Sequence, residues 1–232
     1  MSLPHQILEY PNVINKERIS KSGKGILLRA DDKTYLESHA YKQSVGVEFG
    51  GGAIVIGVWL GASAELSSQY IVPAIFTLGG VFWVVYGIFV NKKYKLFELN
   101  RLEGTVAYPD RFFNPPLKGK FKDLKAVISV SGNIDGYADS EYLKFVNTFK
   151  PRKLDLLYTF YGSDPKKDWS FYVWYMDKNR PLPPGTAFDP YRQQDFERRK
   201  AEGFPRPLYP SDIPTPEATP EQQRERKLIG GW

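Results

Sequence analysis

The residue types that perform most enzyme chemistry are scarce in this sequence of 232 residues. It contains no cysteine and only two histidines, His5 and His39. The lack of cysteine excludes disulfide frameworks, thiolate zinc sites, iron–sulfur clusters and cysteine nucleophiles. Two histidines leave multi-histidine metal sites and most catalytic triads without their parts. The composition therefore predicts a protein that is not an enzyme and that holds no cofactor.

One acidic segment carries oxygen ligands at alternating positions. Asn133, Asp135, Asp139 and Glu141 surround Gly136, which is a pattern similar to a calcium loop. The spacing does not complete the EF-hand pattern, and no pair of helices is expected to flank it. A solvated hairpin loop is the preferred interpretation, so we predict no metal site.

Lysines follow one another closely in a second segment. In a strand, Lys118, Lys120 and Lys122 would share one face, and Lys125 extends the basic segment. Beside a cytoplasmic leaflet such a face could attract anionic headgroups, at about 1 kcal/mol for each cation. Lysines also keep an exposed edge strand from pairing with another chain. The sequence leaves both interpretations open.

Two further basic features form no recognisable site. Ser20–Gly25 has the residue types of a phosphate-binding loop without the order of residues that such a loop needs. The net charge of +6 and the pI of about 9.2 raise the question of nucleic-acid binding. After Lys92, however, the basic residues are interspersed with acidic ones and form no stripe. We therefore expect no nucleic-acid partner.

The elements that position these residues begin with an apolar region, because no Lys or Arg occurs between Lys42 and Lys92. Leu66–Val90 is a run of 25 uncharged residues. As a helix it would measure about 37 Å, enough to cross a hydrocarbon core of about 30 Å. Phe49–Ala64 is uncharged over 16 residues. The sequence predicts a transmembrane helical hairpin in residues 45–91, with helices near 45–64 and 68–90.

The distribution of charge predicts the orientation of this hairpin. Lys and Arg precede the first helix, and Lys92, Lys93 and Lys95 follow the second, whereas the connecting loop has none. Cytoplasmic loops retain such residues, so we expect a multi-pass membrane protein with two spans and both termini cytoplasmic. Glu48 at the inner boundary and Glu65 in the loop indicate no transport site. A cleaved targeting signal and a buried helical hairpin in a soluble protein are the alternatives.

Small residues recur along both predicted helices, where they would let the helix backbones approach closely. They are Gly50, Ala53, Gly57 and Gly61 on the first helix, and Gly80 and Gly87 on the second. These residues could seal the hairpin to itself or form a docking face for another membrane protein. We favour packing of the two helices against each other.

Short β-like runs rich in Val, Ile, Thr and aromatic residues follow the hairpin. They are Tyr94–Asn100, Thr105–Tyr108, Ala126–Val130, Leu143–Phe149, Leu154–Phe160 and Trp169–Tyr175. A turn signal at Asn100–Gly104 joins the first two runs. The pattern predicts an antiparallel meander. Gly25–Ala30 and Thr34–Ala40, ahead of the hairpin, could complete the same domain.

Two apolar helices followed by Leu96–Val106 and by the basic segment before Phe121–Ile128 resemble membrane-anchored bacterial pleckstrin-homology-like (PH-like) domain proteins. The resemblance implies a bent antiparallel sheet that a C-terminal helix closes. Asp189–Gly203 could supply that helix, with Asp189 as its cap and Pro190 in its first turn.

The last part of the chain, residues 204–232, is rich in proline and cannot build a core of its own. Apolar side chains at intervals favour an extended arm that lies along a partner over a free spacer. The candidate anchors are Phe204, Leu208, Tyr209, Ile213 and Trp232.

The sequence thus predicts an α+β membrane protein in four parts. They are a cytoplasmic N-terminal segment (1–44), a transmembrane hairpin (45–91), a cytoplasmic β-rich domain with a terminal helix (92–203) and an extended arm (204–232). We predict a non-enzymatic accessory, assembly or scaffold subunit of a membrane protein complex. Its partners would be the lipid bilayer and one or more proteins, reached through the hairpin and the arm. A membrane-tethered PH-like module that binds lipid or peptide is the alternative.

Overall fold

The computed structural model describes residues 6–8, 26–38, 43–90, 96–109, 115–131, 140–146, 148–149, 158–160, 164–211 and 214–232. The fold is α+β with antiparallel sheets, as the sequence predicts. The chain divides into two compact units. A β-rich unit comprises Met1–Glu37, Phe97–Tyr108 and Leu117–Trp232, and a helical unit comprises Ser38–Leu96 and Pro109–Pro116.

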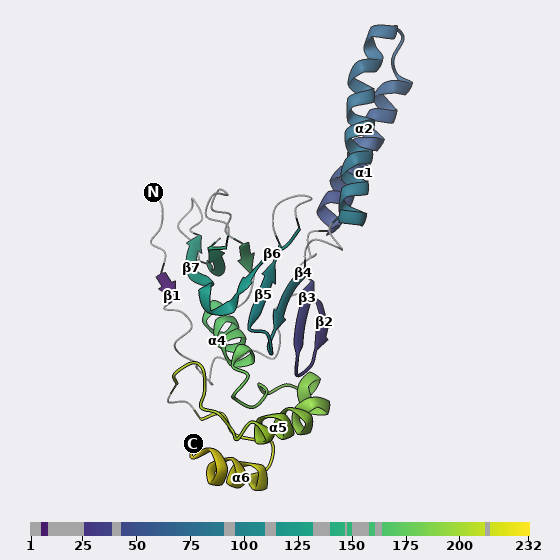
Figure 1. Cartoon of the computed structure of the whole chain (residues 1–232). Helices are drawn as coiled ribbons and strands as arrows, with labels where there is room; N and C mark the ends of the chain where they lie inside the picture. Colours follow the sequence, from purple (N-terminus) through teal and green to yellow (C-terminus); the bar gives the residue numbers. More distant parts are fainter. Residues whose placement is uncertain are drawn as a thin grey trace. The chain divides into compact units, whose positions relative to one another are not determined.

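The larger sheet of the β-rich unit has five strands in the order β2-β3-β4-β5-β6 (Figure 1). They are β2 (Ile26–Ala30), β3 (Thr34–Ser38), β4 (Leu96–Asn100), β5 (Thr105–Tyr108) and β6 (Leu117–Lys120). Buried and half-buried residues alternate along β3, β4 and β5, as expected when one face of a sheet covers a core. The strands that precede the helical unit in sequence therefore join those that follow it.

The second sheet is antiparallel, with strand order β1-β7-β8-β9. Its strands are β1 (Gln6–Leu8), β7 (Lys125–Ser131), β8 (Ser140–Val146) and β9 (Tyr158–Phe160). The long pairing of β7 with β8 runs from Lys125 opposite Val146 to Ser131 opposite Ser140. The strands predicted at 126–130, 143–149 and 154–160 are thus present here as β7, β8 and β9, although β1 was not predicted.

Helix α4 (Pro165–Met176) replaces the strand that the sequence predicts at 169–175, and that prediction is wrong. Asp164 caps the helix, because its carboxylate accepts hydrogen bonds from the backbone N–H groups of Lys166 and Lys167 at 3.0 and 3.1 Å. Pro165 occupies the first turn, which its fixed φ favours. Every residue from Trp169 to Met176 is buried, so the segment lacks the polar face that would have marked it as a helix.

Aromatic side chains of α4 join the two sheets into one core. The ring of Tyr172 lies 5.0 Å from that of Phe97 on β4, and the ring of Trp169 lies 6.0 Å from that of Phe145 on β8. Phe97 and Phe145 also contact each other, with ring centroids 5.8 Å apart. Such ring pairs contribute beyond the area that they bury. The core of this unit is therefore centred on one buried helix.

The C-terminal part of the β-rich unit contains a 3-10 helix η6 (Thr186–Tyr191), α5 (Arg192–Ala201) and α6 (Pro220–Gly230). The first two correspond to the terminal helix predicted at 189–203. Helix α6 was not predicted, although Thr219 caps it, Pro220 begins it and Gly231 ends it with φ of 71°. Helices α5 and α6 lie side by side (Figure 1), and Lys200 of α5 pairs with Glu225 of α6 at 2.6 Å.

The helical unit consists of α1 (Gln43–Ala62), η3 (Ser67–Tyr70), α2 (Ile71–Val85) and the π-helical turn η4 (Tyr86–Val90). In the link between α1 and α2, the side-chain carbonyl of Gln69 accepts hydrogen bonds from the backbone N–H groups of Glu65 and Leu66 at 2.8 and 3.2 Å. Ser68–Phe89 is long and apolar enough to cross a membrane, and Val47–Ala62 is a shorter apolar helix.

Candidate functional site

The contact between α1 and α2 is built on glycine. A Cβ atom placed on Gly50 would lie 2.7 Å from the carbonyl oxygen of Gly80, and one on Gly80 would lie 2.6 Å from that of Gly50. About two helical turns further along α1, a Cβ on Gly57 would lie 2.8 Å from the Pro73 carbonyl oxygen. Ordinary carbon contacts are about 3.5–4.0 Å, so only glycine permits this approach of backbones.

The structure places the predicted packing residues on this contact or close to it. Gly50, Gly57, Gly80 and Gly87 are buried, and Ala53 and Gly61 are half-buried. A Cβ on Gly61 would have ordinary contact with Pro73 at 3.5 Å. The glycines therefore serve the packing of α1 on α2, which is the interpretation that the sequence favours.

The outward face of the helical unit is apolar. Its exposed large side chains include Phe49 at 74%, Trp59 at 68% and Leu78 at 71%. Only 17% of the apolar window within Ser68–Phe89 is buried, whereas the core helix of a soluble protein would be mostly buried. Small residues thus lie inside and large apolar ones outside, which is the reverse of the arrangement that water favours.

Aromatic side chains gather near the end of α2 that leads into η4. Trp83 and Tyr86 meet edge to face with ring centroids 5.8 Å apart, and Phe82 lies 6.3 Å from each of them. At the other end of α2, the Tyr70 hydroxyl donates to the carbonyl oxygen of Ala64 at 3.3 Å. Trp and Tyr are enriched where membrane meets water, so both ends carry residues suited to such an interface.

The four lysines of the basic segment are exposed, but they do not lie on one strand. Strand β6 ends at Lys120, and the 3-10 turn η5 (Phe121–Asp123) follows, so the predicted strand face extends only over Lys118 and Lys120. The chain turns here because Phe121 is buried and donates its N–H to the Gly104 carbonyl oxygen at 2.8 Å. Lys122 lies in the turn, and Lys125 begins β7.

Three of the five predicted arm anchors are held within the chain. The ring of Phe204 is buried 5.3 Å from that of Phe196, and Tyr209 packs 6.2 Å from Phe121. Trp232 donates its indole N–H to the Phe204 carbonyl oxygen at 2.9 Å. The sequence predicts that these anchors lie along a partner, whereas the structure places all three against residues of their own unit.

The two remaining anchors differ from these. Leu208 is 50% exposed, and Ile213 lies outside the described residues. The segment that carries Leu208 is nevertheless fixed through its backbone. The Asp177 carboxylate accepts hydrogen bonds from the N–H groups of Leu208 and Tyr209 at 3.0 and 3.2 Å. Arg180 binds Asp177 at 3.1 Å and donates to the Tyr209 carbonyl oxygen at 2.9 Å.

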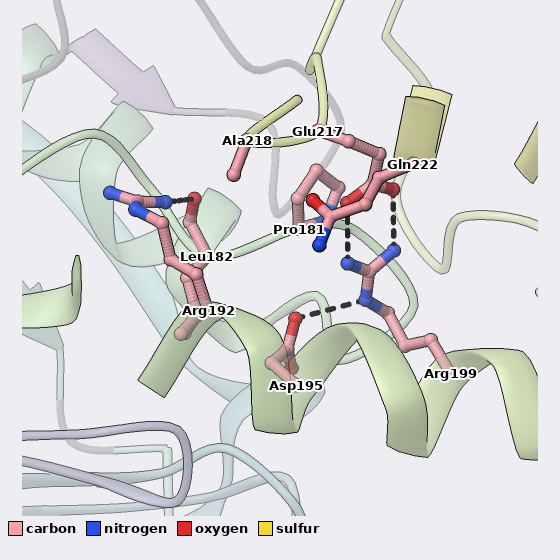
Figure 2. Close-up of a pocket in the computed structure, with 8 residues that line it drawn as sticks. All are labelled: Pro181, Leu182, Arg192, Asp195, Arg199, Glu217, Ala218 and Gln222. Atoms are coloured by element: carbon pink, nitrogen blue, oxygen red, sulfur yellow. Dashed lines mark hydrogen bonds and ion pairs between the residues drawn. The ribbon is translucent and has the colours of Figure 1, made fainter. Parts of the chain in front are cut away.

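A buried ion network attaches the remainder of the arm to α5 (Figure 2). Glu217 accepts two hydrogen bonds of 2.7 Å from Arg199, in the paired geometry that suits guanidinium and carboxylate groups. Arg226 of α6 reaches the same carboxylate at 3.1 Å, and its guanidinium lies 4.2 Å from the ring centre of Trp232. All three charged groups are buried, so each depends on the others for its charge to be compensated.

Asp195 extends this network on the other side of Arg199. Its carboxylate accepts hydrogen bonds of 2.9 Å from both Arg199 and Arg198, and Arg101 lies 3.4 Å away. Burial alone would raise the pKa of the Asp195 carboxyl, but Arg101, Arg199 and Arg198 more than offset burial and hold this pKa below its ordinary value. Asp195 is therefore an ionised structural group.

The hollow at this network is too small for a substrate. Its volume is about 10 Å³, which is about the size of one water molecule. Its lining includes Arg192, Asp195, Arg199 and Glu217, and Figure 2 shows Arg199 directed at Glu217 with Asp195 below. Arg199 is paired with both carboxylates, and Arg192 donates to the backbone carbonyl oxygens of Leu182 and Pro183. This arrangement holds the arm in place.

The candidate calcium loop lies largely outside the described residues, as do His5 and His39. Glu141 is in β8. Among the residues that the structure describes, no three His, Asp or Glu side chains gather as a metal site would need. Comparison with family models, curated proteins and solved structures finds no match. The resemblance to PH-like proteins therefore stays a prediction.

Sequence reasoning missed the ion network entirely. The spacing of Asp195 and Arg199, four residues apart on one helix, is a detectable signal for a pair. No comparable signal connects Arg199 to Glu217, because the two lie 18 residues apart on different segments. Only the folding of the arm against α5 brings them together.

Proposed function

We propose that this protein is a membrane-anchored, non-enzymatic accessory, assembly or scaffold subunit of a membrane protein complex. The observation that carries the proposal is the helical unit, with glycine backbones in contact inside and large apolar side chains outside. Water penalises that exposed apolar surface, whereas lipid accepts it. The unit is therefore suited to a bilayer.

Both helices would cross the membrane in this proposal. Helix α1 contacts α2 from Gly50 to Gly61. Gly50 lies against Val84 at one end of the contact, and Gly61 lies against Pro73 at the other end. A helix packed along the length of a spanning helix shares its lipid environment. The short link between them keeps the loop on one side, and the flanking lysines favour cytoplasmic termini.

Cysteine accessibility tests this topology directly, because the chain contains no cysteine of its own. We would introduce Glu65→Cys in the link and Lys227→Cys on α6, both at exposed positions, and treat intact cells with a membrane-impermeant maleimide. We expect labelling at position 65 only, and labelling at both positions after the membrane is opened. Equal labelling of both positions in intact cells would contradict the topology.

The subunit role is tested by purification from native membranes in mild detergent, with mass analysis of co-eluting proteins. A face of α1 supports this role, because a Cβ on Gly51 or Gly52 would meet nothing within 4 Å. Gly52→Leu should reduce co-elution of a stoichiometric partner while leaving the protein in the membrane. A monodisperse protein without a partner, unaffected by this substitution, would contradict the proposal.

A further inference from the structure

Four exposed lysines, Lys118, Lys120, Lys122 and Lys125, lie within eight residues at the corner between β6 and β7. We propose that this lysine corner binds the anionic phospholipid headgroups of the membrane that anchors the protein. The proposal rests on the membrane anchorage proposed above and adds a second, peripheral contact of the β-rich unit.

The charges of the lysine corner are not neutralised by neighbouring strands. Lys118 lies opposite Ala107, Lys120 opposite Thr105 and Lys125 opposite Val146. The four ammonium groups form no ion pair with another described residue. Three carboxylates lie nearby in sequence or in the sheet: Asp123 in η5, Glu103 beside Thr105, and Glu98 of β4, which lies opposite Ala107. The lysine corner therefore keeps an excess of positive charge.

Protection of a sheet edge explains only part of this pattern. Strand β6 is at the edge of its sheet, so Lys118 and Lys120 could discourage pairing with another chain. Lys122 lies in a turn and Lys125 lies on β7, an interior strand of the other sheet. Neither protects an edge, so a common role for all four lysines needs a different cause.

The corner is held rigidly, which favours binding because no loop must be ordered. Phe121 and Leu124 are buried on either side of Lys122, and the Leu124 N–H donates to the Phe121 carbonyl oxygen at 3.1 Å. The ring of Phe121 lies 5.7 Å from that of Trp169 of α4. The lysines are thus attached to the core of the unit, with their side chains in solvent.

The proposed membrane anchor keeps the β-rich unit close to one source of anions, the lipid surface. Five residues separate the end of η4 from the start of β4. An extended chain covers at most about 3.5 Å per residue, so about 20 Å of chain joins the two elements. Anionic headgroups therefore stay at a high local concentration around the β-rich unit, whereas a soluble polyanion would have to be recruited.

The test uses the full chain in vesicles. A donor dye on Glu103→Cys, beside the corner, reports its distance to acceptor dyes on lipid headgroups by energy transfer. We compare pure phosphatidylcholine with phosphatidylcholine that contains phosphatidylglycerol. We expect higher transfer in the anionic vesicles, and loss of the difference in about 0.5 M salt, where screening shortens electrostatic reach to about 4 Å.

Two triple variants distinguish the effect of the lysine corner on energy transfer from the effect of the net charge of the protein. K118E/K120E/K122E removes the corner, and K33E/R206E/K227E makes the same change of charge at three exposed positions outside it. Loss of three cations, at about fivefold each, should lower the ratio of docked to undocked protein on anionic vesicles by at least about 100-fold in the first variant. The second variant should retain the transfer seen in the unmodified chain.

The outcomes distinguish this proposal from the anchorage on which it rests. A chain that does not float with either vesicle would overturn the anchorage. A chain that floats with both but shows equal transfer in both would overturn the lysine corner alone. Equal loss in the two triple variants would also overturn it, because the effect would then follow net charge and not the corner.

Discussion

Substitution of Gly57 by alanine tests the packing of α1 on α2 with a matched control. The added Cβ would lie 2.8 Å from both the Pro73 carbonyl oxygen and the Thr77 nitrogen, and closer still to the Thr77 hydroxyl. Backbone atoms cannot rotate away, so the helices must separate by about 0.7 Å to restore ordinary contacts. Overpacking of this kind costs about 1–3 kcal/mol.

Gly52→Ala is the control, since its Cβ would meet nothing within 4 Å. Both substitutions gain the same intrinsic preference of alanine for helix, up to about 1 kcal/mol, so the difference between them isolates the contact. We expect the free energy of unfolding of the Gly57→Ala variant to be about 1–3 kcal/mol lower than that of the Gly52→Ala variant.

The measurement is an SDS titration of the reconstituted protein with spin labels at Val58→Cys and Leu78→Cys, which are 59% and 71% exposed. The distribution of distances between the two labels broadens when the helices separate. Gly57→Ala should lower the SDS fraction at the midpoint, and Gly52→Ala should leave it unchanged or raise it. The same midpoint for both variants would refute the packing that the structure shows.

Three further predictions concern the β-rich unit. Glu217→Ala should destabilise it by about 3–5 kcal/mol, because Arg199 and Arg226 would be left buried without their shared carboxylate, and thermal unfolding with limited proteolysis near the arm would detect this. The pKa of Asp195 is lower in the fold than in the unfolded chain. The contribution of Asp195 to stability is therefore complete above the unfolded pKa and is lost as the pH falls through the folded pKa. Unfolding followed below about pH 4 should show that loss, and Asp195→Asn should remove this contribution to the pH dependence of stability. Gly104→Ala should cost about 1–2 kcal/mol, since φ is 67° and no neighbour lies within 4 Å, and an unchanged melting temperature would contradict the backbone argument.

The strands and apolar helices were predictable because their signals are local. Alternation along Leu96–Asn100 and Thr105–Tyr108 follows from one buried face, and a long uncharged run requires no partner to be recognised. Helix α4 shows where such reasoning fails. Its aromatic residues resemble a buried strand, because a helix that is covered on all sides has no polar face to give a period of 3.6 residues.

The sequence alone determined which chemistry is excluded, where the apolar segments lie and which glycines permit close packing. Those properties depend on residue type and on spacing within one segment. The tertiary structure decided that the proline-rich arm is held against α5 and that Glu217 joins Arg199 and Arg226. It also decided that the lysines turn a corner at Phe121. These features depend on contacts between segments far apart in the chain, and a buried charge reveals its partner only after the fold has brought the two together.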